Sequence, residues 1–398
     1  MRIGVNCYNL IPSAGGIKQY FFSLFSELLS KDDKDSYVFF YFPHNVEELS
    51  GFDNDCWQEN AVLLNNQLEV REHLDKIDLY FCPFGSLWPR PLPIPTVVTL
   101  VDIQEVFYPE YFSDVDLFNR AYHYVGSTRM ADRVITISNF SKDTIAKHHH
   151  ISRDRITVAH LCADKRFYRL PEMSLSSPLA VPSEDFLFYP ANHWQHKNHD
   201  TLLRALQWLK YERGMEIKAV FTGHDVPNSY PLLQKAAEYG VDKQVSFVGF
   251  VKVEELVYLY SKAKLMVFPS MFEGFGIPLI EAMAVGCPVI ASNVTSLPEV
   301  GDEAVEFFDP SSPKSIGRAI ETIWRDPHRR KDLVNRGQKH ALDFSAEKTA
   351  RNHLEAFQKA EESFSIYRYL WYGWVYQHYH RALVYFKHRK TLSAKNSS

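Results

Sequence analysis

Paired cysteines and long apolar segments are both absent from this sequence. Its five cysteines are scattered and form no C-x-x-C pair: Cys7, Cys56, Cys82, Cys162 and Cys287. This pattern argues against a disulfide framework and against a zinc site, and it is typical of reduced thiols in the cytoplasm. No stretch approaches the ~18 consecutive apolar residues of a membrane span. We therefore expect a cytoplasmic protein without a transmembrane segment.

Two further absences concern targeting and charge. The first ten residues have no basic segment followed by a long apolar core, so we expect no signal peptide. The formal net charge of −4 gives no argument for a nucleic-acid partner. Hydrophobic residues make up 45% and charged residues 23% of the 398 positions, as in ordinary soluble domains. A chain of this length exceeds one hydrophobic core, which predicts two domains.

Short β-rich apolar runs alternate with helical patterns along the chain. The first half predicts strands at 2–7, 37–41, 79–82, 96–100 and 133–137, with helices at 19–29 and 118–130. The second half predicts strands at 186–189, 218–222, 245–248, 265–269 and 288–291, with helices from about residues 200 and 253. Strands that alternate with helices indicate parallel sheets covered by helices.

The alternation restarts after a segment rich in Pro, Ser and Leu at 169–185. We therefore expect two doubly wound α/β domains, at 1–168 and 186–345, joined by this linker. Residues 346–398 would form C-terminal helices that return to the first domain, followed by an aromatic and basic tail. Ligands of such folds bind at the carboxyl ends of the strands, which predicts a site in a cleft between the domains.

The stretch FEGFGIPLIEAMAVGCPVIAS, residues 272–292, carries the clearest chemical signal. It follows a predicted strand, so we expect Glu273 in the loop at the strand's carboxyl end. Pro278 suits the start of a helix and Gly286 its end, which would place Glu281 in the first helical turn. The glycines of the loop would let the backbone approach a ligand, and the first helical amides would bind an anion. For Glu281 alone, an ordinary acidic first turn is an equally good explanation.

This stretch resembles the E-x7-E signature of the family 4 retaining glycosyltransferases, the group 1 enzymes. They have the GT-B fold, two Rossmann-like domains that face a central cleft. Six more segments resemble that family in the same order: GGIKQY (15–20), TLVDIQEVFYPEYF (99–112), ADRVITISNFSKDTI (131–145), YPANHWQHKNHDTLLRAL (189–206), VSFVGFVKVEELVYLYSKAKLMVFPS (245–270) and TSLPEVGDEAVEFFDP (295–310). The resemblance implies a metal-independent transferase with a GDP-, UDP- or dTDP-linked sugar as donor and no separate cofactor.

The resemblance also implies roles for single residues. Glu281 would bind the ribose hydroxyls of the donor, Glu273 would bind the donor sugar, and Lys197 would neutralise the departing diphosphate. Backbone amides near the diphosphate or sugar would come from Phe275, Gly276 and Ile277, and Phe250 and Val251 would flank the base. Gly15 and Gly16 would let the first helix of the N-terminal domain approach the diphosphate.

Three positions depart from the family pattern. Val101 replaces a histidine, which leaves Asp102 as the nearest polar candidate on the acceptor side. Asn192 and His193 occupy the region of a common arginine, and Lys18 replaces a small residue, so Lys18 would help to neutralise the leaving group. These departures leave open a catalytically silent protein that binds nucleotide-sugars or partner enzymes. A nucleotide-sugar epimerase is the alternative among enzymes.

Three D-x-D triplets and a histidine run are the candidate metal sites in the sequence. The triplets begin at Asp33, Asp53 and Asp114, all in segments that look like polar loops, and chance spacing explains them better. The histidines at 148–150 have no partners at ligand spacing, and we expect a loop there. No metal site is predicted.

The C-terminal segment 364–398 holds ten aromatic residues and six Lys or Arg, but no Asp or Glu. Such a segment can pack on the N-terminal domain or lie on an anionic membrane surface, with its rings at the headgroup level. Both can hold in different halves, and we expect the part from about residue 376 on the inner face of the plasma membrane. We therefore predict transfer of a hexose, such as mannose or rhamnose, to a polysaccharide or lipid-linked oligosaccharide.

Overall fold

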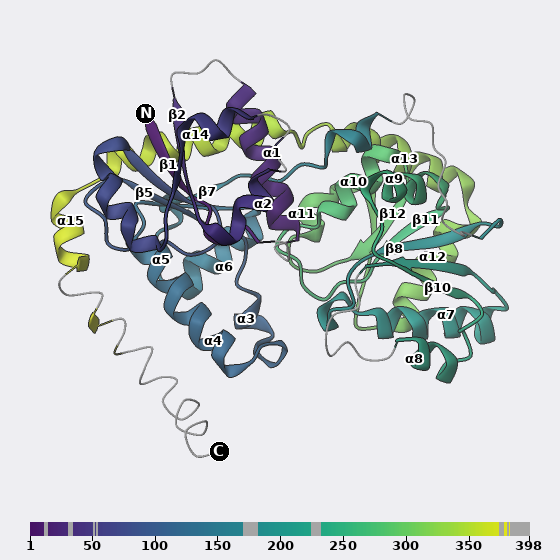
Figure 1. Cartoon of the computed structure of the whole chain (residues 1–398). Helices are drawn as coiled ribbons and strands as arrows, with labels where there is room; N and C mark the ends of the chain where they lie inside the picture. The colour runs from purple at the N-terminus through teal and green to yellow at the C-terminus, as the bar shows by residue number, and fades with distance from the viewer. Residues whose placement is uncertain are drawn as a thin grey trace. The chain divides into compact units, whose positions relative to one another are not determined.

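The computed structural model describes residues 1–11, 15–30, 35–50, 52, 55–169, 182–223, 232–373, 378–379 and 382. The chain forms two compact units. Unit 1 comprises Met1–Leu161 with Ala346–Ser398, and unit 2 comprises Cys162–Ser345. Each unit is built on one parallel sheet (Figure 1). Most of the expected linker and most of the tail beyond Gly373 lie outside the described residues.

The sheet of unit 1 has seven strands in the order β3-β2-β1-β4-β5-β6-β7. They are β1 (Arg2–Asn6), β2 (Ser36–Tyr41), β3 (Ala61–Leu63), β4 (Leu79–Cys82), β5 (Thr96–Thr99), β6 (Arg133–Thr136) and β7 (Ile156–Val158). Its α-helices are α1 (Gly16–Ser30), α2 (Val46–Leu49), α3 (Gln104–Phe107), α4 (Asp114–Arg120), α5 (Gly126–Met130), α6 (Asn139–His149), α14 (Ala346–Ser363) and α15 (Ile366–Trp371). A π-helical turn, Ala121–Val125, joins α4 to α5.

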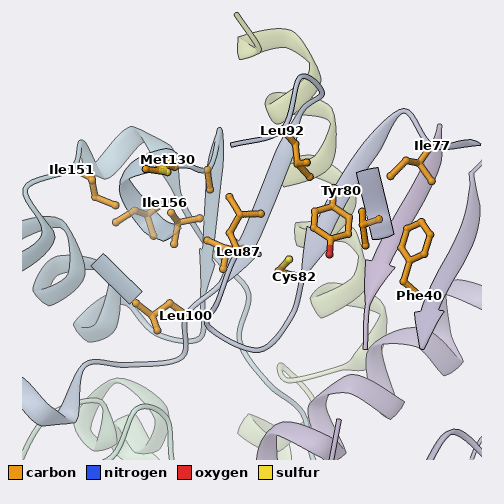
Figure 2. Packing of buried hydrophobic residues seen from close by; sticks show 14 of the residues in the cluster. Phe40, Ile77, Tyr80, Cys82, Leu87, Leu92, Leu100, Met130, Ile151 and Ile156 are labelled. Carbon is orange, nitrogen blue, oxygen red and sulfur yellow. The ribbon is translucent and has the colours of Figure 1, made fainter. Parts of the chain in front are cut away.

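Adjacent residues of one strand serve two different cores in unit 1, because successive side chains point to opposite faces of a sheet. Phe81 packs against Phe25 of α1 and Phe357 of α14. Its neighbour Tyr80 points to the other face, into the cluster drawn in Figure 2. That cluster also holds Phe40, Ile77, Cys82, Leu87, Leu92, Leu100, Met130, Ile151 and Ile156. Burial on both faces explains why these strands are nearly continuous apolar runs.

The sheet of unit 2 has six parallel strands in the order β10-β9-β8-β11-β12-β13. They are β8 (Phe186–Pro190), β9 (Lys218–Thr222), β10 (Val245–Gly249), β11 (Leu265–Phe268), β12 (Val289–Ser292) and β13 (Val305–Phe308). The helices are α7 (His199–Arg213), α8 (Leu232–Glu238), α9 (Val253–Lys262), α10 (Ile277–Val285), α11 (Leu297–Gly301), α12 (Pro313–Arg325) and α13 (Pro327–Ala341). Helix α7 packs on α12, and α10 packs on α13.

The two parallel sheets confirm the predicted α/β class, but three strands were not predicted. These are β3, β7 and β13, and each lies at the edge of its sheet. They are short and only partly buried, so they lack the continuous apolar run that marks a central strand. Unit 2 also begins earlier than residue 186, because Phe167 packs against Tyr260 of α9.

The D-x-D triplet at Asp114 does not lie in a loop as predicted. It forms the first turn of α4, where Ser113 caps the helix and Asp116 completes a capping box. This acidic turn suits a helix N-terminus and explains the triplet without a metal. The triplets at Asp33 and Asp53 include residues outside the described part of the chain.

The prediction of a loop at the histidine run is also wrong. His148 and His149 end α6, and the His149 Nδ1 lies 2.8 Å from the Thr128 hydroxyl in a buried position. Over the described ranges, no group of three His, Cys, Asp or Glu is placed to hold a metal ion. Nor does any helix in those ranges have the length and apolarity needed to cross a membrane.

Helix α14 returns to unit 1 through a buried polar contact with α1. The His353 Nε2 lies 2.6 Å from the Tyr20 hydroxyl, and its Nδ1 lies 2.8 Å from the Thr349 carbonyl. A carbonyl only accepts, so Nδ1 carries the proton and Nε2 accepts from Tyr20. Burial lowers the pKa of His353 to about 4. The imidazole is therefore neutral at neutral pH, as this arrangement requires.

This histidine predicts acid sensitivity of unit 1. A histidine in the unfolded chain has a pKa near 6.5, while the pKa of folded His353 is about 4. Its contribution to the stability of unit 1 is therefore intact above pH 6.5 and declines as the pH falls towards 4. From pH 7 to pH 5 the free energy of unfolding should fall by about 2 kcal/mol. Amide hydrogen exchange in α1 and α14, corrected for intrinsic rates, measures it. His353→Gln should lose less protection on acidification than the wild type, and an equal loss in both would contradict the assignment.

Candidate functional site

The turn from β11 into α10 carries the glycine-rich loop. Gly276 caps α10 in the left-handed conformation, with φ 104°, and an added Cβ would lie 2.6 Å from Leu297 Cδ2. Ile277 is the first helical residue, so its amide precedes any acceptor within the helix. Pro278 follows and has no N–H to offer. The turn therefore presents the Gly276 and Ile277 amides at the positive end of the helix dipole.

Glu281 lies in the second turn of α10, not in the first as predicted, because the helix begins at Ile277. Its side chain is buried, and its Oε2 accepts a hydrogen bond from the Tyr260 hydroxyl at 3.0 Å. Burial, and next the charge of Glu281, raise the pKa of Tyr260 well above its ordinary value. The phenol therefore keeps its proton and holds the carboxylate in one orientation.

Lys197 and Glu273 form an ion pair, with 2.6 Å between Nζ and Oε1. Both side chains are largely buried, so water screens the pair less than it screens surface pairs. The Lys197 ammonium also lies 5.5 Å from the centre of the Phe268 ring. The structure thus brings together two predicted residues that come from different loops, one after β8 and one after β11.

Hydrogen bonds tie these two loops to each other. Asn198, in the left-handed conformation with φ 62°, donates from Nδ2 to the Pro269 and Pro310 carbonyls at 3.0 and 2.9 Å. The Met271 amide donates to the His196 carbonyl at 2.7 Å. Burial, followed by the charge of Lys197, lowers the pKa of His196 to about 4. The imidazole beside Lys197 is therefore neutral at neutral pH.

A third loop, after β12, supports the backbone of Glu273. The Glu273 amide donates to the Thr295 hydroxyl at 3.2 Å, and the Ser296 hydroxyl lies 2.9 Å from the Glu273 carbonyl. The same Ser296 hydroxyl lies 3.0 Å from the Phe275 carbonyl. Thr295 has φ 54°, which is strained for a β-branched residue. Sequence reasoning missed these supports, together with Tyr260 and Asn198, because their side chains matter only through contacts between distant segments.

Phe250 and Val251 follow β10 at the same edge of the sheet. Phe250 is exposed, and it follows Gly249, which has φ 73°. An exposed aromatic ring presents a face on which a planar ligand can stack. Asn192 follows β8 at this edge as well. The predicted residues of unit 2 therefore gather at the carboxyl ends of β8, β10 and β11, where ligands of parallel sheets bind.

Unit 1 holds the remaining predicted residues. Gly15, with φ 55°, and Gly16 stand at the start of α1. Lys18 forms an ion pair with Glu48 of α2. The charge of Lys18 is therefore already met inside unit 1.

Asp102 lines a cavity of about 210 Å³ in unit 1, beside Val101 and Arg120. A second cavity of about 730 Å³ shares four lining residues with it, Arg120 among them, so the two adjoin. The larger cavity combines aromatic rings with planar amides: Tyr8, Trp88, Tyr124, Asn9, Gln67 and Asn119. Tyr124 belongs to the π-helical turn, and such turns often occur at functional sites.

Comparison with known proteins identifies the family. Residues 176–340 match the glycosyl transferases group 1 family. O-antigen chain mannosyltransferase B of Escherichia coli is 31% identical over 66% of this chain and 70% of its own length. The chain belongs to the group 1 glycosyltransferases. It is therefore an enzyme, as the resemblance predicted. The O-antigen chain mannosyltransferase RfbU of Salmonella typhimurium is 29% identical, over 58% of this chain and 61% of its own.

Solved structures extend the likeness of this group 1 glycosyltransferase to most of the chain. Anabaena HepE, solved with UDP and glucose, has a TM-score of 0.69 and 18% identity, over 90% of this chain and 99% of its own. WaaG, a glycosyltransferase involved in lipopolysaccharide biosynthesis, has a TM-score of 0.63 and 16% identity, over 89% of this chain and 98% of its own. At these identities the likeness shows the fold, and it confirms the predicted GT-B class.

The Gly276 turn predicts a substitution effect with a matched control. Gly276→Ala adds a methyl group against Leu297 and forces alanine to φ 104°, outside the small left-handed region open to L-residues, whereas Gly214→Ala keeps φ 64° inside that region with nothing within 4 Å. Gly214→Ala, the control, should lower the free energy of unfolding by about 1–2 kcal/mol through its left-handed backbone alone. Gly276→Ala should lower it by roughly 1–3 kcal/mol more, through overpacking and the less favourable φ. Hydrogen-exchange protection of α10 and α7 measures both, and equal losses would contradict a tightly packed turn.

Proposed function

We propose that this glycosyltransferase moves a hexose, with mannose as the first candidate, from a nucleotide-sugar to a glycan or lipid-linked oligosaccharide. The transfer would retain the anomeric configuration and need no metal. The observation that carries the proposal is the Lys197–Glu273 pair beside the Gly276 turn. Mannose is favoured over rhamnose because relatives at about 30% identity bear the name O-antigen chain mannosyltransferase.

Departure of the nucleoside diphosphate is the step that this arrangement would assist. The leaving group gains negative charge in the transition state, and fixed cations and N–H groups stabilise such charge best when they are already in position. Lys197 would supply the cation, and the amides of Gly276 and Ile277 would supply the N–H groups, with Phe275 beside them. Glu273 would orient Lys197 and bind hydroxyls of the donor sugar. Lys18 is likewise paired, with Glu48, and its help in neutralising the leaving group stays a prediction.

The nucleoside would lie along the same sheet edge. Glu281 would accept hydrogen bonds from the ribose hydroxyls while Tyr260 fixes its carboxylate. The exposed Phe250 ring would stack on the base, with Val251 beside it. A solved complex of Anabaena HepE contains UDP-glucose, which supports a nucleotide-sugar donor but leaves GDP, UDP and dTDP as candidates for this chain.

The two adjoining cavities of unit 1 would receive the acceptor. Aromatic rings suit the apolar faces of sugars, and planar amides suit their hydroxyls. Asp102 lies in the smaller cavity and would accept a hydrogen bond from an acceptor hydroxyl, since Val101 offers no polar group. The catalytically silent protein and the epimerase are not favoured by any contact among the described residues.

Two substitutions in unit 2 test the donor assignment. Glu281→Ala should weaken binding of the cognate nucleoside diphosphate by about 1–3 kcal/mol, roughly five- to 150-fold, through the lost hydrogen bonds. Glu273→Ala should chiefly lower kcat, because the bonds that it loses serve the sugar and Lys197. Glu303→Ala is the matched control, since this exposed glutamate lies in the short helical turn directly before β13, at the amino end of the strands and not at their carboxyl ends.

Calorimetry measures the affinity, and turnover with the sugar nucleotide measures kcat. Unchanged affinity in Glu281→Ala would remove the ribose assignment. A kcat of Glu273→Ala equal to that of Glu303→Ala would remove the proposed role of the ion pair.

A further inference from the structure

Helix α15, the first helix of the C-terminal segment, is held on unit 1 through one arginine. The Arg368 guanidinium lies 3.4 Å from Asp132 Oδ1 and donates to the Arg129 and Ala131 carbonyls at 3.3 and 2.9 Å. Asp132 is buried, so the contact is partly shielded from water. The Arg368 guanidinium also lies over the Tyr372 ring, 5.3 Å from the centre of the ring. The orientation of α15 on unit 1 is therefore fixed by several polar contacts.

Apolar contacts complete the inner side of this segment. Phe364, Tyr369 and Tyr372 line a hollow of only about 20 Å³ together with Leu92 and Met130 of unit 1. A hollow this small indicates close packing. The packing explanation for the tail therefore applies to its first part, residues 364–372.

The outer side of α15 is apolar and exposed to solvent. Tyr367 is 81% exposed, Leu370 57%, Trp371 54% and Ile366 46%. Residues three and four apart share one side of a helix, so Tyr367, Leu370 and Trp371 form a single face. Single exposed apolar residues are ordinary on a protein surface, but a concentrated group marks an interaction surface.

The charge of the following chain indicates which partner this surface fits. Residues 374–398 contain five Lys or Arg and no Asp or Glu. Most of these residues lie outside the described part of the chain, so only their composition enters here. Cationic side chains are attracted to anionic lipid, and Trp and Tyr rings settle at the headgroup level. Neither preference alone specifies a membrane, but the two together favour an anionic lipid surface over a neutral protein.

We propose that the outer face of α15, formed by Ile366, Tyr367, Leu370 and Trp371, docks on an anionic lipid surface. Arg368 holds the helix on unit 1, so docking would bring the whole enzyme to the membrane rather than a detached tail. The cationic residues beyond Gly373 add attraction that fades within a Debye length. This proposal is independent of the donor and its chemistry, and it places the enzyme where a lipid-linked acceptor would be found.

Flotation of the full chain with lipid vesicles tests the proposal. Vesicles of phosphatidylcholine alone should not carry the protein, whereas vesicles mixed with phosphatidylglycerol should carry it at low salt. Raising the salt from about 0.1 M to about 1 M shortens the Debye length from about 10 Å to about 3 Å, so flotation should weaken. A full chain that ignores anionic vesicles at low salt would overturn the proposal and point to a protein partner or to none.

Variants locate the contact. Tyr367→Ser with Leu370→Ser should lower partitioning onto anionic vesicles roughly tenfold, because two apolar side chains no longer enter the interface. The matched control carries the same changes at Tyr211 and Leu342, which are 64% and 67% exposed on unit 2, and it should float like the wild type. Equal flotation of the two double variants would exclude α15 as the contact.

Two further measurements separate charge from packing and from catalysis. A chain that ends at Gly373 keeps α15 but loses the cationic residues that follow it, so it should lose the preference for anionic lipid. A retained preference would refute the charge contribution.

Transfer to a water-soluble acceptor should be unchanged in the α15 double variant, since neither Tyr367 nor Leu370 lies in the proposed donor or acceptor site. A loss of this transfer would mean that α15 serves the fold of unit 1 and not docking.

Discussion

The ion pair between Lys197 and Glu273 is the contact on which the rest of the site depends. It joins two loops that meet because β8 and β11 are neighbours in a parallel sheet and their carboxyl ends share one edge. Two largely buried charges are stable there only as partners, since either alone would pay the full cost of desolvation. The pair is therefore kept in position before a donor binds, which is the preorganisation that stabilisation of a leaving group requires.

The surrounding backbone is arranged to preserve this pair. Asn198 and Thr295 both adopt positive φ values that ordinary residues avoid, and each makes a hydrogen bond that fixes one of the two loops. Only glycine fits at position 276 without a shift of its neighbours, because Leu297 occupies the space that a Cβ would need. Positive φ at Asn198 and Thr295, on both sides of one ion pair, indicates that the geometry of the loops, more than their local stability, is what the fold maintains.

The central strands could be predicted from the sequence, whereas of the edge strands β3, β7, β10 and β13 only β10 could be. Strands such as β4 and β11 are buried on both faces and consist of consecutive apolar residues, while β3, β7 and β13 have neighbours on one side only and are only partly buried. The resemblance to the family supplied Lys197 and Glu273 as candidates, but not their direct contact. Glu281 was placed one turn too early because the helix starts at Ile277. Tyr260 carries no sequence signal, since its role exists only through a hydrogen bond across two helices.

We propose that unit 2 binds a nucleotide-sugar and activates it without a metal. The most direct measurement is transfer by the purified full chain, in excess EDTA, from a panel of GDP-, UDP- and dTDP-linked hexoses to a mannose-containing glycan. We predict transfer from one of these donors at the same rate with and without EDTA, and a product with the anomeric configuration of the donor. Transfer that is lost in EDTA and restored by manganese, or a product with inverted configuration, would contradict it.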